Sequence, residues 1–223
     1  MDVLLKAHRV KCIITAIDLE FLAVIKQLNI HHEHIYKVND ECTIAECIDR
    51  NIVVAQAGIG KAKAKECAED LYKYYPYICG FLSIGLAGAL SDQLKIGDIV
   101  IGNSIIDKEQ NAYERIDFYD TAILSKINND NIKYGPILCS DEFIMDTEKK
   151  QYSFNKFGAL CVEMESKGIV NFATEKGVSF LVIKIISDYA NEKAIKSIFR
   201  SHMIVCNSLA NYVDTIIDNI FCA

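Results

Sequence analysis

Short apolar runs alternate with amphipathic stretches along the whole chain. The apolar runs are rich in β-branched residues and end in small or polar ones, which is typical of buried strands. Those expected as strands are residues 10–17, 51–58, 78–88, 96–107, 135–145 and 179–186. In several of the intervening stretches apolar residues recur three and four positions apart, the spacing of one helix face. Those expected as helices are residues 18–28, 61–75 and 195–221, while residues 159–177 pass from a strand into a helix.

Strands that alternate with helices of this length predict an α/β fold, with a mixed and mostly parallel central sheet flanked by helices. The chain has 223 residues, 51% of them hydrophobic, which is enough to form one substantial core. It contains only two prolines and no Gly/Ser-rich linker. We therefore expect a single domain over residues 1–223.

The charge pattern indicates which kinds of binding partner are not expected. The net charge is −6 and no block of five or six like charges occurs, so we expect neither nucleic acid nor a membrane surface as partner. No apolar run is long enough to predict a membrane span. The first eleven residues lack the apolar core and cleavage site of a secretion signal, so we expect a cytoplasmic protein.

The chain has nine cysteines, a high and odd number. Several lie within apolar runs, as buried free thiols do. Cys42 and Cys47 form the closest pair, and no histidine is spaced to complete a zinc site with them. We interpret the cysteines as reduced thiols rather than a disulfide framework. We expect no metal and no organic cofactor.

Acidic and small residues follow the ends of the expected strands. They are Glu20, Gly58 with Gly60, the stretch from Gly85 to Gly88, Asp141 with Phe143, Glu163 with Glu165, and Asp188. Because the carboxyl ends of parallel strands meet at one crevice, we expect these residues to lie around one binding site.

Each of these signals also has a purely structural interpretation. Asp188 follows a buried strand, where aspartate often caps a helix or forms a turn. Glu163 and Glu165 stand at a predicted helix start, where the dipole favours solvent-facing carboxylates, but one carboxylate can also accept both hydroxyls of a ribose diol. The glycines before residue 61 fit a tight turn, or a loop whose N–H groups bind oxygen.

Four motifs in order along the chain carry a resemblance to a known family. They are "FLSIGLAGAL", "LKIGDIVIGNSIID", "GALCVEME" and "VSFLVIKIISDYAN". Together they resemble the purine nucleoside phosphorylase/uridine phosphorylase superfamily, and within it most closely the 5′-methylthioadenosine/S-adenosylhomocysteine nucleosidases. The resemblance extends from about Cys12 into the C-terminal helix, and it implies the nucleoside phosphorylase-like fold.

The resemblance also implies roles for individual residues. Asp188, in "ISD", matches the general acid at purine N7, and Glu20 matches the glutamate that activates water, with Lys184 at the position of a basic residue near both glutamate and water. Around the substrate, the residues implied as binding are Glu165 and Met164 at the ribose, Phe143 and Ile144 at the base, and Glu163, Leu86 and Gly88 nearby. Cleavage of an N-glycosidic bond builds positive charge on the sugar and negative charge on the purine, so acids at both ends suit it.

Two departures from the family pattern bear on the nucleophile. Leu86 stands where nucleosidases usually have a serine and phosphorylases a serine or threonine. The phosphate-binding segment of many phosphorylases is replaced by "TAIDLEF", and no arginine matches a phosphate-binding position. Both favour water over phosphate. The segment between Ile106 and Tyr134 is shorter and more charged than in a standard nucleosidase. The resemblance therefore does not specify the group at the 5′ position of the substrate.

We therefore expect hydrolysis of a purine nucleoside to free base and a ribose derivative. A phosphate-dependent phosphorylase is one alternative, and a non-catalytic nucleoside sensor is another. Glu20, Glu165 and Asp188 together argue against the sensor, because binding alone needs no water-activating base. The family resemblance also implies a homo-oligomer, a dimer in the first instance, with a small-molecule purine nucleoside as the other partner.

Overall fold

The computed structural model describes residues 4–39, 42–109, 112–117 and 131–220. Its strands are β1 Val10–Thr15, β2 Ile35–Lys37, β3 Thr43–Cys47, β4 Ile52–Gln56, β5 Ile78–Ala89, β6 Ile99–Glu109, β7 Ala112–Asp117, β8 Ile132–Cys139, β9 Cys161–Glu163 and β10 Ser179–Asp188. Its α-helices are α1 Asp18–Gln27, α2 Lys61–Tyr74, α4 Thr147–Phe157, α5 Ser166–Lys176 and α6 Ala194–Ile220. Short 3-10 turns occur at His32–His34 and Ile48–Arg50.

The strands form one mixed sheet that closes on itself on one side. Parallel pairings join β4, β1, β5 and β10 in the centre, and β6, β8 and β9 beside them. Antiparallel pairings join β10 to β6, β9 to β5, and add β3 and β2 at the outer edge. The strands β5, β10, β6, β8 and β9 therefore follow one another in a closed ring, since β5 pairs with both β10 and β9. The carboxyl ends of β5 and β10 meet β9 at one mouth of this ring, where Gly88 pairs with both Asp188 and Val162.

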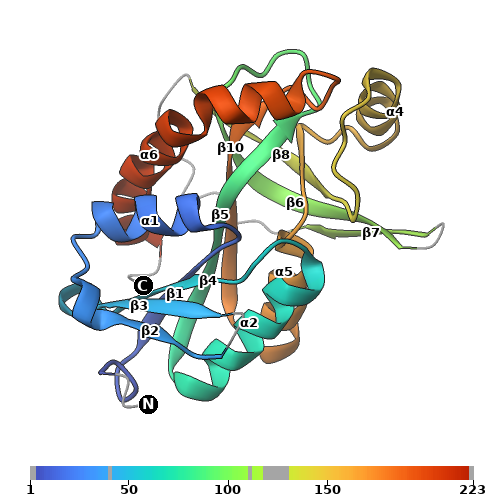
Figure 1. The fold of residues 1–223 in the computed structure, drawn as a ribbon. Helices are drawn as coiled ribbons and strands as arrows, with labels where there is room; N and C mark the ends of the chain where they lie inside the picture. The colour runs from blue at the N-terminus through green and yellow to red at the C-terminus, as the bar shows by residue number, and fades with distance from the viewer. Residues whose placement is uncertain (1–3, 40–41, 110–111, 118–130, 221–223) are drawn as a thin grey trace.

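Helices cover both faces of the open part of the sheet (Figure 1). Helices α1 and α6 pack on one face, and α2 and α5 pack on the other. The alternation within β1 shows why, because Ile13 joins the core on the α1/α6 side whereas Cys12 and Ile14 join the core on the α2/α5 side. A strand buried on both faces reads as a continuous apolar run.

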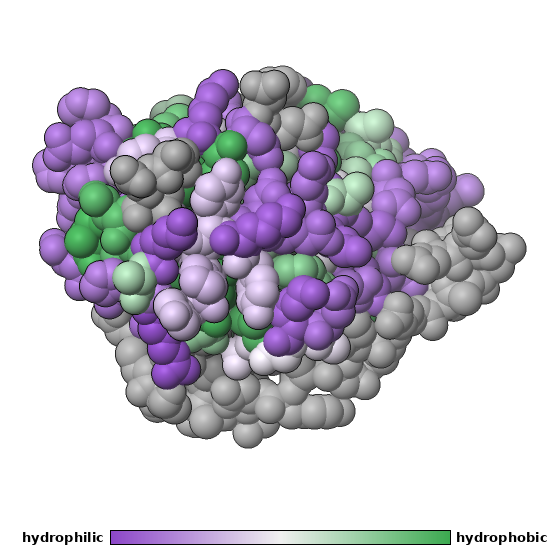
Figure 2. Space-filling view, turned by 90° about the horizontal axis from the view of Figure 1, so that it is seen from below, coloured by the Kyte–Doolittle hydropathy of each residue, from purple (hydrophilic) through white to green (hydrophobic). Residues whose placement is uncertain are grey.

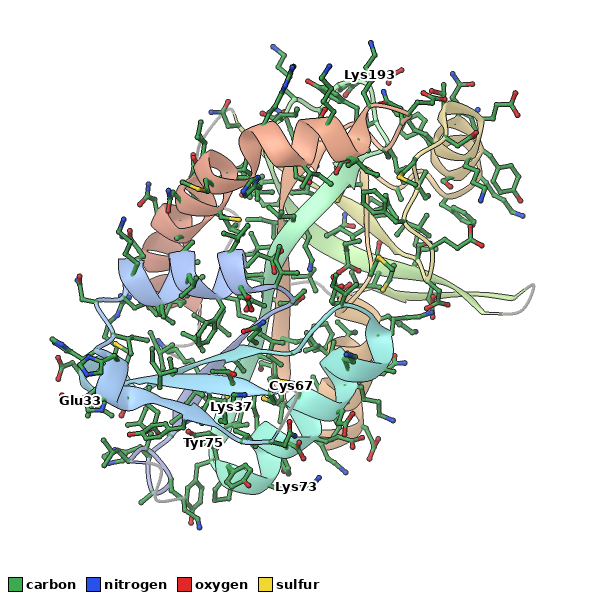
Figure 3. All side chains as sticks on the ribbon, viewed as in Figure 1. Glu33, Lys37, Cys67, Lys73, Tyr75 and Lys193 are labelled. Atoms are coloured by element: carbon green, nitrogen blue, oxygen red, sulfur yellow. The ribbon has the colours of Figure 1, made fainter. Side chains whose placement is uncertain are left out.

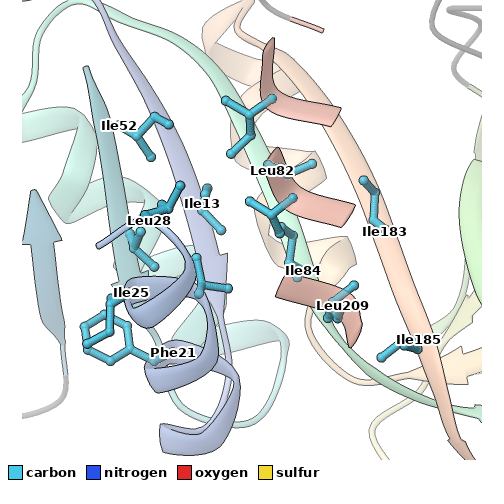
Figure 4. Close-up of a cluster of buried hydrophobic side chains, with 14 of the residues drawn as sticks. Ile13, Phe21, Ile25, Leu28, Ile52, Leu82, Ile84, Ile183, Ile185 and Leu209 are labelled. Carbon is cyan, nitrogen blue, oxygen red and sulfur yellow. The ribbon is translucent and has the colours of Figure 1, made fainter. Parts of the chain in front are cut away.

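The core on the α1/α6 side is shown in Figure 4. Ile13 lies opposite Leu82, and Leu82 opposite Leu181, so that neighbouring strands present one apolar layer. Phe21 of α1 and Leu209 of α6 pack on this layer. Full burial of each such side chain contributes roughly 1.5–3 kcal/mol, so this layer holds both helices in place.

The N-terminal segment is fixed by a buried carboxylate on β3. The Glu46 side chain accepts hydrogen bonds from the backbone N–H groups of Leu4 and Leu5, at 2.9 and 3.0 Å, and from the Tyr75 hydroxyl at 2.9 Å. Burial, with the negative charge of Glu46, raises the pKa of Tyr75. Tyr75 and Cys67, both labelled in Figure 3, belong to the core on the α2/α5 side of the sheet.

An extra residue interrupts the pairing of β10 with β5. The register runs from Ser179 opposite Gly80 to Ile186 opposite Ala87, and then Asp188 lies opposite Gly88. Ser187 is the additional residue, and such a β-bulge re-aims the side chain that follows it. The bulge lies where β10 reaches the mouth of the ring.

Most of the predicted elements are confirmed, with two kinds of correction. The strand predicted over residues 135–145 instead begins at Ile132 and ends at Cys139, and the residues after it form a loop and then α4. The short edge strands β2 and β3 were not predicted from the sequence. The predicted mixed α/β sheet flanked by helices is confirmed.

The described surface is mainly hydrophilic on the face shown in Figure 2, with small separate apolar patches. Within the parts of the chain that the structure describes, no helix has the length and apolar character needed to cross a membrane.

Candidate active site

A cavity of about 240 Å³ opens at the carboxyl ends of the central strands. Its lining includes the side chains or backbone of Glu20, Leu86, Gly88, Phe143, Ile144, Glu163, Met164, Glu165 and Asp188, with Ala16, Ile17, Ile59, Ala87, Glu142, Val162, Ser187 and Ile198. Of the residues given roles by the family resemblance, all but Lys184 line this cavity, and Lys184 contacts Glu163. Gly58, Gly60, Gly85 and Asp141, which were also expected around the site, are not among the lining residues. Residues far apart in the chain therefore meet at one crevice, as the strand-end argument predicts.

Glu20 is held by backbone groups from two strands. Its Oε2 accepts hydrogen bonds from the N–H groups of Ala16 (2.8 Å) and Ile17 (3.1 Å), and its Oε1 accepts one from Leu86 (2.8 Å). A Cβ at Gly85 would lie 2.9 Å from Oε1, so this close approach requires glycine there. Burial raises the pKa of Glu20, although the charge of Lys184 and the backbone bonds oppose the rise. The backbone hydrogen bonds thus fix the position of the Glu20 carboxylate, and its raised pKa means that it binds a proton more tightly than an ordinary glutamate does.

Asp188 lines the same cavity and comes immediately after the bulge. Its Oδ2 accepts a hydrogen bond from the Ser187 hydroxyl at 2.9 Å, and its Oδ1 accepts one from the Ala190 N–H at 2.8 Å. A Cβ at Gly88 would lie 3.0 Å from Oδ1, so the facing strand also gives way to this carboxylate. Burial raises the pKa of Asp188, against the effect of these two bonds.

Lys184 and Glu163 form a buried ion pair behind the cavity. Their side chains are 2% and 0% exposed, and Lys184 Nζ lies 2.9 Å from Glu163 Oε2. Glu163 also accepts hydrogen bonds from the Ser166 hydroxyl at 2.6 Å and from the N–H groups of Ser166 and Glu165. Burial alone would lower the pKa of Lys184, but the surrounding glutamates hold it above its ordinary value. Burial raises the pKa of Glu163, but Lys184 and the hydrogen bonds outweigh it, so the net shift is downward. Both members of the pair are charged.

Glu165 is a further carboxylate of the cavity. Its Oε1 accepts a hydrogen bond from the Gly60 N–H at 3.0 Å, which ties it to the loop before α2. Gly60 has a φ of +107°, a backbone conformation that favours glycine. Burial, with the nearby charges of Glu163 and Glu20, raises the pKa of Glu165 to about 7 although Lys184 opposes the rise.

The remaining walls are apolar. They are formed by Ile17, Ile59, Leu86, Phe143, Ile144, Val162, Met164 and Ile198. Phe143 is 44% exposed and stands at the rim, whereas Ile144 is buried. Among the described residues that line the cavity there is no lysine, arginine or histidine. The site therefore combines carboxylates on the floor with a surface suited to flat apolar rings.

Several residues of the site were not predicted from the sequence. Ser187 was overlooked although it directly precedes Asp188, and its hydroxyl could have been noted as a donor to that carboxylate. Ile198 belongs to α6, and a helix residue at a distant cavity gives no sequence signal. Among the residues described, no group of three His, Cys, Asp or Glu side chains is arranged to hold a metal ion.

The chain belongs to the phosphorylase superfamily, whose family model matches residues 11–218. Among curated proteins it is 30% identical to the 5′-methylthioadenosine/S-adenosylhomocysteine nucleosidase of Staphylococcus epidermidis over 188 residues, covering 75% of this chain and 78% of that protein. It is also 30% identical over 166 residues to the nucleosidase of the same name from Staphylococcus aureus strain RF122, covering 66% of this chain and 72% of that protein.

Solved structures confirm the nucleoside phosphorylase-like fold. The 5′-methylthioadenosine/S-adenosylhomocysteine nucleosidase of Helicobacter pylori, bound to butyl-thio-DADMe-Immucillin-A, superposes with a TM-score of 0.86 at 22% identity, covering 95% of this chain and 99% of that one. The native structure of futalosine hydrolase from the same organism gives a TM-score of 0.84 at 21% identity, with the same coverage.

Proposed function

We propose that this protein hydrolyses the N-glycosidic bond of a purine nucleoside of the 5′-methylthioadenosine/S-adenosylhomocysteine type, releasing the free base and a ribose derivative. The observation that carries the proposal is that Glu20, Glu165 and Asp188 line one cavity. The nucleosidase relatives at 30% identity support the same reaction. The whole chain acts as one nucleosidase domain and needs no cofactor.

Asp188 is the general acid. As the bond between the sugar C1′ and the purine N9 breaks, its electron pair moves into the purine, and a proton from Asp188 to N7 neutralises the leaving base. Burial raises the pKa of Asp188, which keeps a proton available closer to neutral pH than an ordinary aspartate would. The Ser187 hydroxyl and the Ala190 N–H fix the direction of the carboxyl group.

Glu20 is the general base. Water attacks C1′ of the cationic sugar, and Glu20 takes the proton that the water loses, so atoms and charge balance. Its backbone bonds leave the carboxylate little freedom, which suits a base that must meet one water. A positioned acid and a positioned base each contribute roughly 10²–10⁴-fold to the rate.

Glu165 binds the ribose, and Glu163 acts through Lys184. The carboxylate of Glu165 accepts hydrogen bonds from the 2′ and 3′ hydroxyls, with Met164 against the sugar. The oxygens of Glu163 are already engaged by Ser166, Lys184 and the backbone, so we assign Glu163 the task of positioning Lys184. The positive charge of Lys184 in turn favours the ionised forms of Glu20 and Glu165.

The base lies between the apolar walls. Phe143 offers a ring face at the rim, and Ile144 contributes backbone hydrogen bonds and an apolar side chain to the base. Leu86 closes the side nearest Glu20, where its N–H holds the carboxylate rather than the substrate. Gly88 lies beside Asp188. This arrangement fits a neutral aromatic base and a neutral ribose.

The lining argues for water as the nucleophile. Phosphate would carry about two negative charges into a cavity whose described lining has carboxylates and no cation, which electrostatics disfavours. A phosphorylase would therefore find no cation for phosphate among the described lining residues. A non-catalytic sensor would need no general base, so it would not explain the position of Glu20.

Two further expectations belong to this proposal. The protein forms a homodimer through apolar side chains exposed on α1 and α6, such as Leu22, Met203 and Ile204. It works in the cytoplasm, which is consistent with buried cysteines that are free thiols.

Incubation with methylthioadenosine, adenosylhomocysteine, adenosine and inosine, with and without phosphate, tests the proposal. We expect release of free base that is independent of phosphate. A requirement for phosphate would establish the phosphorylase instead, and release from none of these nucleosides would contradict the enzyme.

A further inference from the structure

A lysine outside the cavity joins two acidic side chains from different parts of the chain. Lys61 Nζ lies 2.8 Å from Asp107 Oδ1 and 3.0 Å from Asp141 Oδ2. Lys61 is the first residue of α2, Asp107 lies near the end of β6, and Asp141 follows the end of β8. Burial lowers the pKa of Lys61, but the two carboxylates outweigh this and keep the ammonium charged.

The two partners of Lys61 differ sharply in burial. The Asp107 side chain is 0% exposed, and its Oδ2 has no hydrogen-bond partner among the described residues. Without Lys61 this carboxylate would be a buried charge with no compensation, so the pair with Asp107 is a structural anchor. The Asp141 side chain is 69% exposed, and an exposed ion pair contributes little to global stability. The second bond therefore acts mainly on the position of Asp141.

Asp141 opens the loop that forms one wall of the cavity. The Ser140 N–H donates to the Glu163 carbonyl at 2.8 Å, which fixes the start of this loop. Its far end is fixed where Asp146 accepts the Lys149 N–H at the start of α4. Between these points lie Phe143 and Ile144, which line the cavity. Lys61 thus restrains the loop just before its cavity-lining residues.

The turn at residues 60 and 61 also holds a second part of the cavity lining. Gly60, the residue before Lys61, donates its N–H to Glu165. The start of α2 is itself fixed against α5, because a Cβ at Gly168 would lie only 2.1 Å from the Lys61 carbonyl oxygen. Residues 60 and 61 therefore connect a cavity carboxylate with the loop that carries Phe143.

We propose that Lys61 is a positioning residue, which holds Asp141 against the buried Asp107 and thereby fixes the base-binding loop relative to Glu165. The inference rests on the proposed function for its effect on substrate, because that function places the base against Phe143 and Ile144. The distance between the base and ribose subsites is then set by the two adjacent residues Gly60 and Lys61.

Asp141→Ala tests the inference without disturbing the buried pair of Lys61 and Asp107. We expect KM for the nucleoside to rise about tenfold while kcat stays within about twofold, since an unordered loop must be ordered on binding. Asp92→Ala is the matched control. Lys150, whose side chain is 10% exposed, bonds Asp92, which is 93% exposed, at 2.7 Å, so the control breaks a similar pair outside residues 140–146. We expect wild-type KM in this control.

Hydrogen exchange of the free protein supplies a readout that needs no substrate. We expect the amides of residues 142–145 to exchange faster in Asp141→Ala than in wild type, and at the wild-type rate in Asp92→Ala. Unchanged exchange in Asp141→Ala, or an unchanged KM, overturns the inference. If wild type releases base from no nucleoside, the proposed function fails, while exchange still decides whether Lys61 restrains the loop.

Discussion

Lys184 and Glu163 form an ion pair of 2.9 Å from which solvent is almost excluded. Removing one member of such a pair leaves a buried charge uncompensated, which costs about 3–5 kcal/mol. We therefore expect Lys184→Met to lower the free energy of unfolding by about that amount. Urea unfolding followed by circular dichroism measures it. The double variant Lys184→Met/Glu163→Gln should recover part of the loss, and additive losses would contradict the coupling of the pair.

Asp188→Asn tests the general acid. An amide cannot give a proton to the departing base, so we expect kcat to fall by at least ~10²-fold. The asparagine oxygen still accepts the Ala190 N–H, and thermal unfolding should stay close to wild type. Steady-state release of free base provides the measurement. A variant that keeps wild-type kcat would remove the assignment.

Gly85→Ala tests the position of Glu20. The new Cβ would meet Glu20 Oε1 at 2.9 Å and its Cδ at 3.2 Å, which displaces the carboxylate from its backbone donors. We expect kcat to drop about as far as in Glu20→Gln, by roughly 10²–10⁴-fold. The double variant should be no slower than either single variant, because both changes remove one function. Multiplied losses would show that Gly85 acts elsewhere.

Glu165 predicts a pH dependence of stability. Its pKa is about 7 in the folded protein, whereas its ordinary value is 4.5. Between these two pH values the folded state keeps the Glu165 carboxyl group protonated, and the unfolded state loses that proton. The stability contributed by this proton is present below pH 4.5 and is lost as pH rises through 7. Glu165→Gln lacks this loss. As the pH rises, the free energy of unfolding of Glu165→Gln should therefore increase relative to that of wild type, by on the order of 1–3 kcal/mol.

Calorimetric melting of both proteins across that pH range is the measurement. A constant difference between wild type and Glu165→Gln would show that Glu165 titrates normally. The same variant should bind nucleoside more weakly, since an amide replaces the acceptor for the ribose hydroxyls. The carboxylate thus reduces stability in the free protein while it serves binding.

Leu86→Ser tests whether this position faces the reacting centre. The Leu86 side chain lines the cavity while its N–H holds Glu20, so the substitution leaves the backbone bond in place and adds a hydroxyl to the lining. We expect kcat to rise, with a lower melting temperature from the lost apolar contact. Lower stability with unchanged kcat and KM would mean that Leu86 serves only packing.

The sequence predicted the central strands and the gathering of the carboxylates because both follow from local rules. Buried strands such as β1 consist mainly of apolar residues, and Asp188 is the last residue of another such strand, β10. The closure of the ring could not be predicted, since it depends on β5 pairing with both β10 and β9 over long separations. Helix α4 buries only Lys150 and Ser153, so it has no apolar periodicity to detect.

The ion pairs of Lys61 could not be predicted from the sequence either. Its partners Asp107 and Asp141 lie 46 and 80 positions further along the chain, and nothing local marks them as one cluster. Only the register of β6 with β8 brings Asp107 abreast of Cys139, two residues before Asp141. Pair contacts of this kind arise from topology, and topology is a property of the whole sheet.

Because Ser187 is an extra residue in β10, substitutions within the strand need not change the direction of the Asp188 side chain. Upstream of it, β10 can exchange one aliphatic side chain for another without turning the acid, because the irregular step resets the direction of Asp188. Deleting that single serine would restore regular pairing and point Asp188 away from the base. We therefore expect insertions and deletions to be excluded at this step in any active descendant of this chain.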